Sequence, residues 1–95
     1  MRLSADIQNF FRSQVKGTYP MAKLYLFGSR VDDSRKGGDI DILILNPEKI
    51  DSSWLRALRI AFFKQFGWQK IDIISYVSNE KDSFKELVLN EAVEI

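Results

Sequence analysis

The stretch from Leu24 to Leu45 reads LYLFGSRVDDSRKGGDIDILIL and decides the fold. Two short runs rich in strand-forming residues, 23–27 and 39–45, flank a loop of glycine and charged residues. The second run begins Asp-Ile-Asp, and the period of two along a strand places Asp39 and Asp41 on the same face. The stretch therefore predicts two strands, with a pair of carboxylates at the start of the second.

The residues outside this stretch predict three helices and one further strand. Apolar residues recur at helical spacing over 3–16 and 51–66, and a last helix is expected over roughly 80–92. The run KIDIISYV, residues 70–77, is rich in β-branched residues and predicts a third strand. The predicted order is helix, strand, strand, helix, strand, helix.

This order constrains the sheet. The strand at 39–45, the helix at 51–66 and the strand at 70–77 form a βαβ unit, in which the two strands are parallel. The first two strands are joined by only eleven residues, which favours an antiparallel pair. Gly28 and Ser29, at the end of the first strand, would then face the two aspartates.

The predicted fold class is α/β (α+β). We expect a small mixed sheet of three or more strands, with helices packed mainly on one face. The length of 95 residues predicts one domain over 1–95. A chain of this size buries a small core, so any active site should be a surface cleft.

A third carboxylate is expected to join the first two. Asp72 occupies the start of the third strand, and parallel pairing brings it to the same end of the sheet as Asp39 and Asp41. Two like charges about 4 Å apart repel by about 4 kcal/mol at an effective dielectric of 20. Mg²⁺ relieves such repulsion, because it prefers oxygen ligands and binds carboxylates together with substrate phosphates. Two such ions can clamp the attacking and leaving oxygens of a phosphoryl displacement.

The Gly-Ser turn suits the phosphate side of such a reaction. Gly28 would let backbone N–H groups approach a phosphate, and Ser29 supplies a hydroxyl donor. A short helix beginning at Ser29 would add the positive end of its dipole. Arg30 is a candidate phosphate ligand, and Arg35 and Lys36 could screen a triphosphate.

Each of these residues also has a simpler explanation when taken alone. A Gly-Ser pair after a strand is usually a turn. Aspartate at a strand start often only keeps that end of the strand in solvent. The functional interpretation depends on the spacing, the strand context and the third aspartate taken together.

Composition excludes several classes of chemistry. The chain has no cysteine and no histidine, so thiolate catalysis, imidazole bases and cysteine zinc sites are excluded. The net charge of +1 argues against a general polyanion binder. The sequence shows neither a signal peptide nor the roughly 20 apolar residues of a membrane helix, so we expect a cytoplasmic protein.

Aromatic residues gather in and around the second helix. Phe62, Phe63 and Phe66 are expected in the core, although one side of the helix could be a partner surface. Trp54 and Trp68 flank this helix and are also expected in the core, with an interface anchor as the alternative.

The segment LFGSRVDDSRKGGDIDILI resembles the signature of nucleotidyltransferases of the DNA polymerase β type. That signature consists of an apolar strand, Gly-Ser, about ten residues and Asp-x-Asp in a second strand. A third acidic residue follows on a later strand, and KIDIIS supplies it here. The short length resembles the minimal nucleotidyltransferases (MNT), which are paired with HEPN-domain proteins in toxin–antitoxin modules. The resemblance implies a polymerase β-like nucleotidyltransferase core.

The resemblance also implies a reaction, in which a nucleoside monophosphate passes from an NTP, with ATP as the expected donor, to a hydroxyl. Gly28 and Ser29 would hold the triphosphate, with Arg30 beside them. Asp39 and Asp41 would bind two Mg²⁺ ions, and Asp72 would bind the ion next to the acceptor hydroxyl and help to activate it. The acceptor can be a tyrosine of a HEPN toxin partner, which gives the chain an antitoxin role.

Two other functions stay open at this point. The chain could be a binding module that neutralises a partner by occlusion, with weak or no catalysis. The acceptor could also be RNA, although the near-neutral charge and the absence of a basic stripe count against it. The sequence does not specify the nucleotide or the acceptor hydroxyl.

Overall fold

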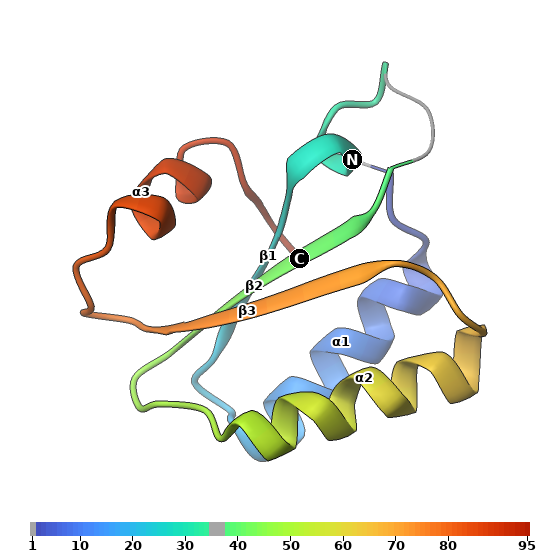
Figure 1. The fold of residues 1–95 in the computed structure, drawn as a ribbon, viewed down its shortest axis with the longest axis horizontal. Helices are drawn as coiled ribbons and strands as arrows, with labels where there is room; N and C mark the ends of the chain where they lie inside the picture. The colour runs from blue at the N-terminus through green and yellow to red at the C-terminus, as the bar shows by residue number, and fades with distance from the viewer. Residues whose placement is uncertain (1, 35–37) are drawn as a thin grey trace.

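The computed structural model describes residues 2–34 and 38–95 and has the expected mixed α/β class (Figure 1). Within these residues three helices and four strands are present, together with one 3₁₀ turn, η1. In chain order they are α1 (Ala5–Thr18), β1 (Lys23–Phe27), η1 (Gly28–Val31), β2 (Ile40–Asn46), α2 (Ser52–Phe66), β3 (Ile71–Val77), α3 (Ser83–Leu89) and β4 (Val93–Glu94).

The sheet has the strand order β3-β2-β1-β4. Strands β2 and β3 are parallel, and β1 is antiparallel to β2, as the lengths of the two connections predict. The fourth strand, β4, pairs antiparallel with β1 through only two residues, opposite Tyr25 and Leu26. The topology places the start of β2 between the end of β1 and the start of β3.

Helices α1 and α2 lie side by side against one face of the sheet (Figure 1). The isoleucines of β2 at positions 40, 42 and 44 point into this layer and are almost completely buried. Phe11 of α1 stacks on Phe62 of α2, with ring centroids 5.6 Å apart, and both side chains are fully buried. Full burial of such a side chain contributes about 1.5–3 kcal/mol. The apolar cluster on this face is the larger of the two, so this face holds most of the core.

The opposite face is covered only in part, by α3. Leu43 and Leu45 of β2 pack against Val88 of this helix. The helix spans seven residues and is shorter than the predicted range 80–92. It begins late because Glu80 N–H donates to the carbonyl of Val77 in a turn, and Asp82 is the N-cap. The acidic start of β2 therefore lies on the face that carries α3.

The other helix ends follow from local capping. α1 begins two residues after the predicted start because Ser4 is its N-cap, with the Ser4 hydroxyl accepting from Ile7 N–H at 3.3 Å. α2 begins after Asp51 and ends at Gly67, whose φ of +77° suits glycine. No helix in the described part of the chain combines the length and the apolar character needed to cross a membrane.

The two tryptophans differ in environment. Trp54 is half-buried against Tyr19, with ring centroids 4.9 Å apart. Trp68 is 78 % exposed, so the prediction that it packs in the core is wrong. It follows Gly67, where α2 has already ended, and so lies beyond the helical face that carries the core residues.

Candidate active site

Strand register brings the predicted carboxylates to one end of the sheet. Asp41 and Asp72 are direct partners across the parallel β2–β3 pair, and Phe27 is the partner of Asp41 on β1. The β2–β3 pairing starts one residue earlier, where Ile40 N–H donates to the carbonyl of Lys70 at 3.1 Å. Phe27, Asp41 and Asp72 thus form one row across three strands, on the face that carries α3.

Asp41 is the electrostatic centre of this row. Its pKa is raised from the ordinary 3.8 to about 6, first by partial burial and then by the negative charges of Asp72 and Asp39. A side-chain hydrogen bond with Asp72 raises the pKa further, whereas the positive charge of Lys70 lowers it. The surroundings of Asp41 therefore favour either a proton or a cation at its carboxylate.

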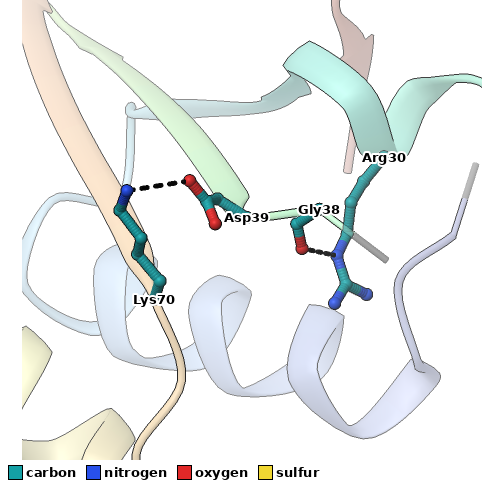
Figure 2. A network of polar contacts seen from close by, with 4 residues as sticks. All are labelled: Arg30, Gly38, Asp39 and Lys70. Atoms are coloured by element: carbon teal, nitrogen blue, oxygen red, sulfur yellow. Dashed lines mark hydrogen bonds and ion pairs between the residues drawn. The ribbon is translucent and has the colours of Figure 1, made fainter. Parts of the chain in front are cut away.

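The carboxylate of Asp39 points toward Lys70 in this structure. Its Oδ2 forms an ion pair with Nζ of Lys70 at 3.4 Å (Figure 2). Within residues 2–34 and 38–95, no three acidic side chains converge closely enough to enclose one metal ion. The geometry is thus a close pair, Asp41 and Asp72, with Asp39 beside it and held by Lys70.

Sequence reasoning missed Lys70, although the signal was present. Ile40 and Ile71 are partners in the register, so the residues before them, Asp39 and Lys70, are neighbours across the strands. In the sequence, Lys70 directly precedes the first isoleucine of the third strand, and Asp39 directly precedes the first isoleucine of the second strand. Because these two strands are parallel, this pattern indicates the contact.

Two glycines let the backbone approach the site closely. Gly28 has φ +76°, and a Cβ there would overlap Oδ2 of Asp41. Gly38 has φ +92°, and a Cβ there would overlap Oγ of Ser29. Both positions need glycine for conformation and for space. The loop is thus built to place the Gly-Ser turn against the carboxylates.

The turn after β1 differs from the expected helix. η1 is a single 3₁₀ turn of four residues, closed by Asp32 N–H donating to the carbonyl of Ser29 at 3.3 Å. So short a segment carries no appreciable helix dipole, so the expected contribution of a dipole at Ser29 is wrong. The Ser29 hydroxyl is half-buried beside Gly38, and its role in phosphate binding stays a prediction.

Arg30 reaches backbone carbonyls in this structure. Its Nε donates to the carbonyl of Gly38 at 3.2 Å, and its Nη1 donates to the carbonyl of Arg2 at 3.0 Å (Figure 2 shows the first). In return, Nη2 of Arg2 donates to the carbonyl of Ser29 at 3.0 Å. A role for Arg30 in phosphate binding stays a prediction. The other two predicted cations, at positions 35 and 36, lie outside the described residues.

We call these reciprocal contacts between Arg2 and Arg30 the arginine clasp. Arg2 also donates from its backbone N–H to the carbonyl of Arg30 at 2.8 Å and from Nε to the carbonyl of Asp32 at 3.1 Å. Sequence reasoning did not identify Arg2, since nothing in a local pattern links residues so far apart. The clasp fixes the position of the Gly-Ser turn.

The donor set fits a hard divalent cation. Asp39, Asp41 and Asp72 offer only carboxylate oxygens, which Mg²⁺ prefers, and the chain has no thiol or imidazole that would favour zinc. Gly28 packs against Asp41 so closely that the Asp41 carboxylate fits there only because position 28 has no side chain. A cation bound here would relieve the repulsion that raises the pKa of Asp41.

Comparisons with known proteins indicate the family and the fold of the chain. A family model described as "Nucleotidyltransferase domain" matches residues 6–95, a range that includes all three aspartates and the Gly-Ser turn. A search of curated proteins finds no match.

Two similar solved structures are crystal structures of mutants of the toxin–antitoxin MntA–HpeT. The first carries a tyrosine-to-alanine substitution; its TM-score is 0.72, with 18% identity over 99% of this chain and 72% of that chain. The second carries two aspartate-to-glutamate substitutions; its TM-score is 0.69, with 17% identity over 92% of this chain and 70% of that chain. At these identities the likeness shows a shared fold.

Proposed function

The chain belongs to the nucleotidyltransferase domain family, and from this premise we propose that it transfers a nucleoside monophosphate from an NTP to a hydroxyl group. The observation that carries the proposal is the direct pairing of Asp41 and Asp72 on parallel strands, with Gly28 packed against Asp41. ATP is the proposed donor, which makes the chain an adenylyltransferase.

Each site residue has a proposed role in this reaction. Two Mg²⁺ ions, held by Asp39, Asp41 and Asp72, would neutralise the developing charge on the phosphates. The backbone at Gly28 and the hydroxyl of Ser29 would hold the triphosphate, with Arg30 beside them. Asp72 is exposed and accepts the proton of the incoming hydroxyl.

The proposed step is an in-line displacement at the α-phosphorus. The acceptor oxygen forms a bond to the α-phosphorus while its proton passes to Asp72. The bond from the α-phosphorus to the oxygen that bridges to the β-phosphate breaks, and pyrophosphate leaves with that electron pair. Positioning and charge compensation supply most of the catalysis in reactions of this kind.

We propose that the acceptor hydroxyl belongs to a partner protein, with a tyrosine of a HEPN-type toxin as the leading candidate. The two similar solved structures are toxin–antitoxin proteins. The residues substituted in them, one tyrosine and two aspartates, are the residue types that this reaction requires. The open, exposed position of Asp72 supports an acceptor that arrives from outside the chain.

The experiment is a labelling reaction with Mg²⁺, α-labelled ATP and a candidate HEPN-type toxin. We expect label on the toxin, and at least about a hundredfold less label with Asp39→Asn combined with Asp41→Asn, since both would-be metal ligands lose their charge. Glu48→Gln, which neutralises an exposed carboxylate in the β2–α2 loop, is the matched control and should label normally. Equal labelling by the double variant would reject the mechanism.

A second candidate function is neutralisation of a partner by occlusion. The observation that favours it is the orientation of Asp39, which is paired with Lys70, so that the three carboxylates do not form a closed cluster within the described residues. The variant with asparagine at all three aspartates separates the two functions. Neutralisation of the toxin without labelling would favour occlusion, whereas loss of both would favour catalysis. Label on RNA in place of protein would identify an RNA acceptor.

A further inference from the structure

The ion pair between Lys70 and Asp39 has no role in the reaction described so far. We propose that Lys70 is a positioning residue that holds Asp39 in the metal-free chain and competes with the divalent ion for that carboxylate. This inference rests on the proposed function, because it assumes that Asp39 is a metal ligand. Metal binding would then include an exchange of partners at Asp39, from the ammonium to the ion.

The pair is set by strand register. The hydrogen bond from Ile40 N–H to the Lys70 carbonyl fixes the two strand starts side by side. Asp39 and Asp41 share one face of β2, and Lys70 shares a face of β3 with Asp72 by the same alternation. The ammonium therefore reaches Asp39 from the acidic face, at 3.4 Å (Figure 2).

Lys70 is also the cation whose charge acts against the repulsion within the site. Its ammonium lies 3.4 Å from Oδ2 of Asp39, and its positive charge also acts on Asp41, two positions along the same face of the strand. A divalent ion would do the same with twice the charge. The ammonium and the ion therefore stabilise the same carboxylates and exclude one another from Asp39.

The exposure of the pair sets the size of the effect. The Lys70 and Asp39 side chains are 67% and 42% exposed, and ion pairs this accessible to water are weak. The ammonium is therefore displaced at modest cost. We expect its removal to tighten binding of a divalent ion by about three- to tenfold, because a competing and repelling charge disappears.

The experiment measures binding of Mn²⁺ alone to the full chain, from the electron paramagnetic resonance signal of the free ion. Lys70→Met should bind Mn²⁺ about three- to tenfold more tightly than the wild type, and Lys70→Arg, which keeps the charge, within about twofold of it. Lys49→Met is the matched control, since it removes an exposed lysine from the β2–α2 loop and should leave the affinity within about twofold.

A double-mutant cycle separates competition for Asp39 from a general charge effect. In an Asp39→Asn background, the gain from Lys70→Met should shrink to less than about twofold, because the carboxylate for which the two cations compete is neutral. A full gain in that background would overturn the proposal, as would equal affinities of the wild type and Lys70→Met. In both cases metal binding, and with it the proposed function, would stand. Absence of Mn²⁺ binding in every variant would overturn both.

Discussion

At the scale of single residues, Asp41 makes the metal-free protein sensitive to pH. Its pKa is about 6 in the folded chain and 3.8 in the reference state, so the folded chain binds this proton more tightly. The resulting stabilisation is fully present below about pH 3.8 and is lost as the pH rises through about 6. Above that pH the ionised carboxylate is held beside Asp72 and Asp39.

We therefore predict that Asp41→Asn raises the Tm of the metal-free chain at pH 7.5 by about 2–5 °C, after allowance for screening by solvent. At pH 4 the same substitution should change the Tm by less than about 1 °C, since Asp41 is then largely protonated. Thermal unfolding followed by circular dichroism in EDTA measures both. Glu48→Gln should have little effect at pH 7.5, and a lower Tm of Asp41→Asn at that pH would show that the ionised carboxylate stabilises the fold.

The sequence predicted those features of the candidate site that depend on the alternation of side chains along a strand. Alternation along β2 and β3 places Asp41 and Asp72 on one face, and the register then pairs them. The two residues that were missed, Lys70 and Arg2, make contacts with other segments of the chain. Lys70 contacts a residue of the neighbouring strand connection, and Arg2 contacts Ser29, which lies 27 positions later in the chain. No pattern within one element specifies such contacts.

At the scale of elements, Lys85 holds α3 in place. Lys85 is only 6% exposed. Its ammonium donates to the carbonyls of Val77, Ser78 and Glu80 at 3.3, 2.8 and 2.7 Å. A helix of seven residues is not stable alone, so its position depends on such contacts. Lys85 thereby ties α3 to the end of β3.

We predict that Lys85→Met lowers the Tm by about 5–10 °C. Methionine keeps most of the apolar stem but leaves three partly buried carbonyl hydrogen bonds without their donor, which costs about 1–3 kcal/mol. Lys81→Met is the control, because Lys81 is exposed, and its Tm should stay within about 1 °C of the wild type. Equal Tm values for the two variants would show that water replaces the ammonium without loss.

Sequence reasoning at this scale predicted the long periodic elements and the short strand β1 (Lys23–Phe27), but it missed β4 and the start of α3. α1, α2, β2 and β3 were all expected, because apolar spacing repeats several times within each. The two residues of β4 carry no period and are held by pairing with β1. The start of α3 depends on the turn at residues 77–80, which competes with the helical pattern.

At the scale of the whole molecule, one face of the sheet carries most of the apolar core and the other carries the candidate active site. One face, under α1 and α2, carries the larger apolar cluster, and the other combines a small cluster under α3 with the acidic row. The repulsion at the acidic end is therefore offset by packing on the opposite face. An ion that binds only the folded chain should raise its stability further.

We predict that 10 mM Mg²⁺ raises the Tm of the wild type by several degrees at pH 7.5 and by less at pH 5, where protons compete for Asp41. The measurement is thermal unfolding with and without the ion. KCl at equal ionic strength is the control, because it screens the charges without occupying the site. An equal rise with KCl would show that screening alone accounts for the effect.

The arginine clasp has a practical consequence for biochemical work. Because Arg2 binds the carbonyls of Ser29 and Asp32, the first described residue of the chain is part of the scaffold behind the Gly-Ser turn. An affinity tag fused ahead of Arg2 leaves the molecule beside this turn. A tag at this position would lie next to the turn, so it should be cleaved before nucleotide binding is measured.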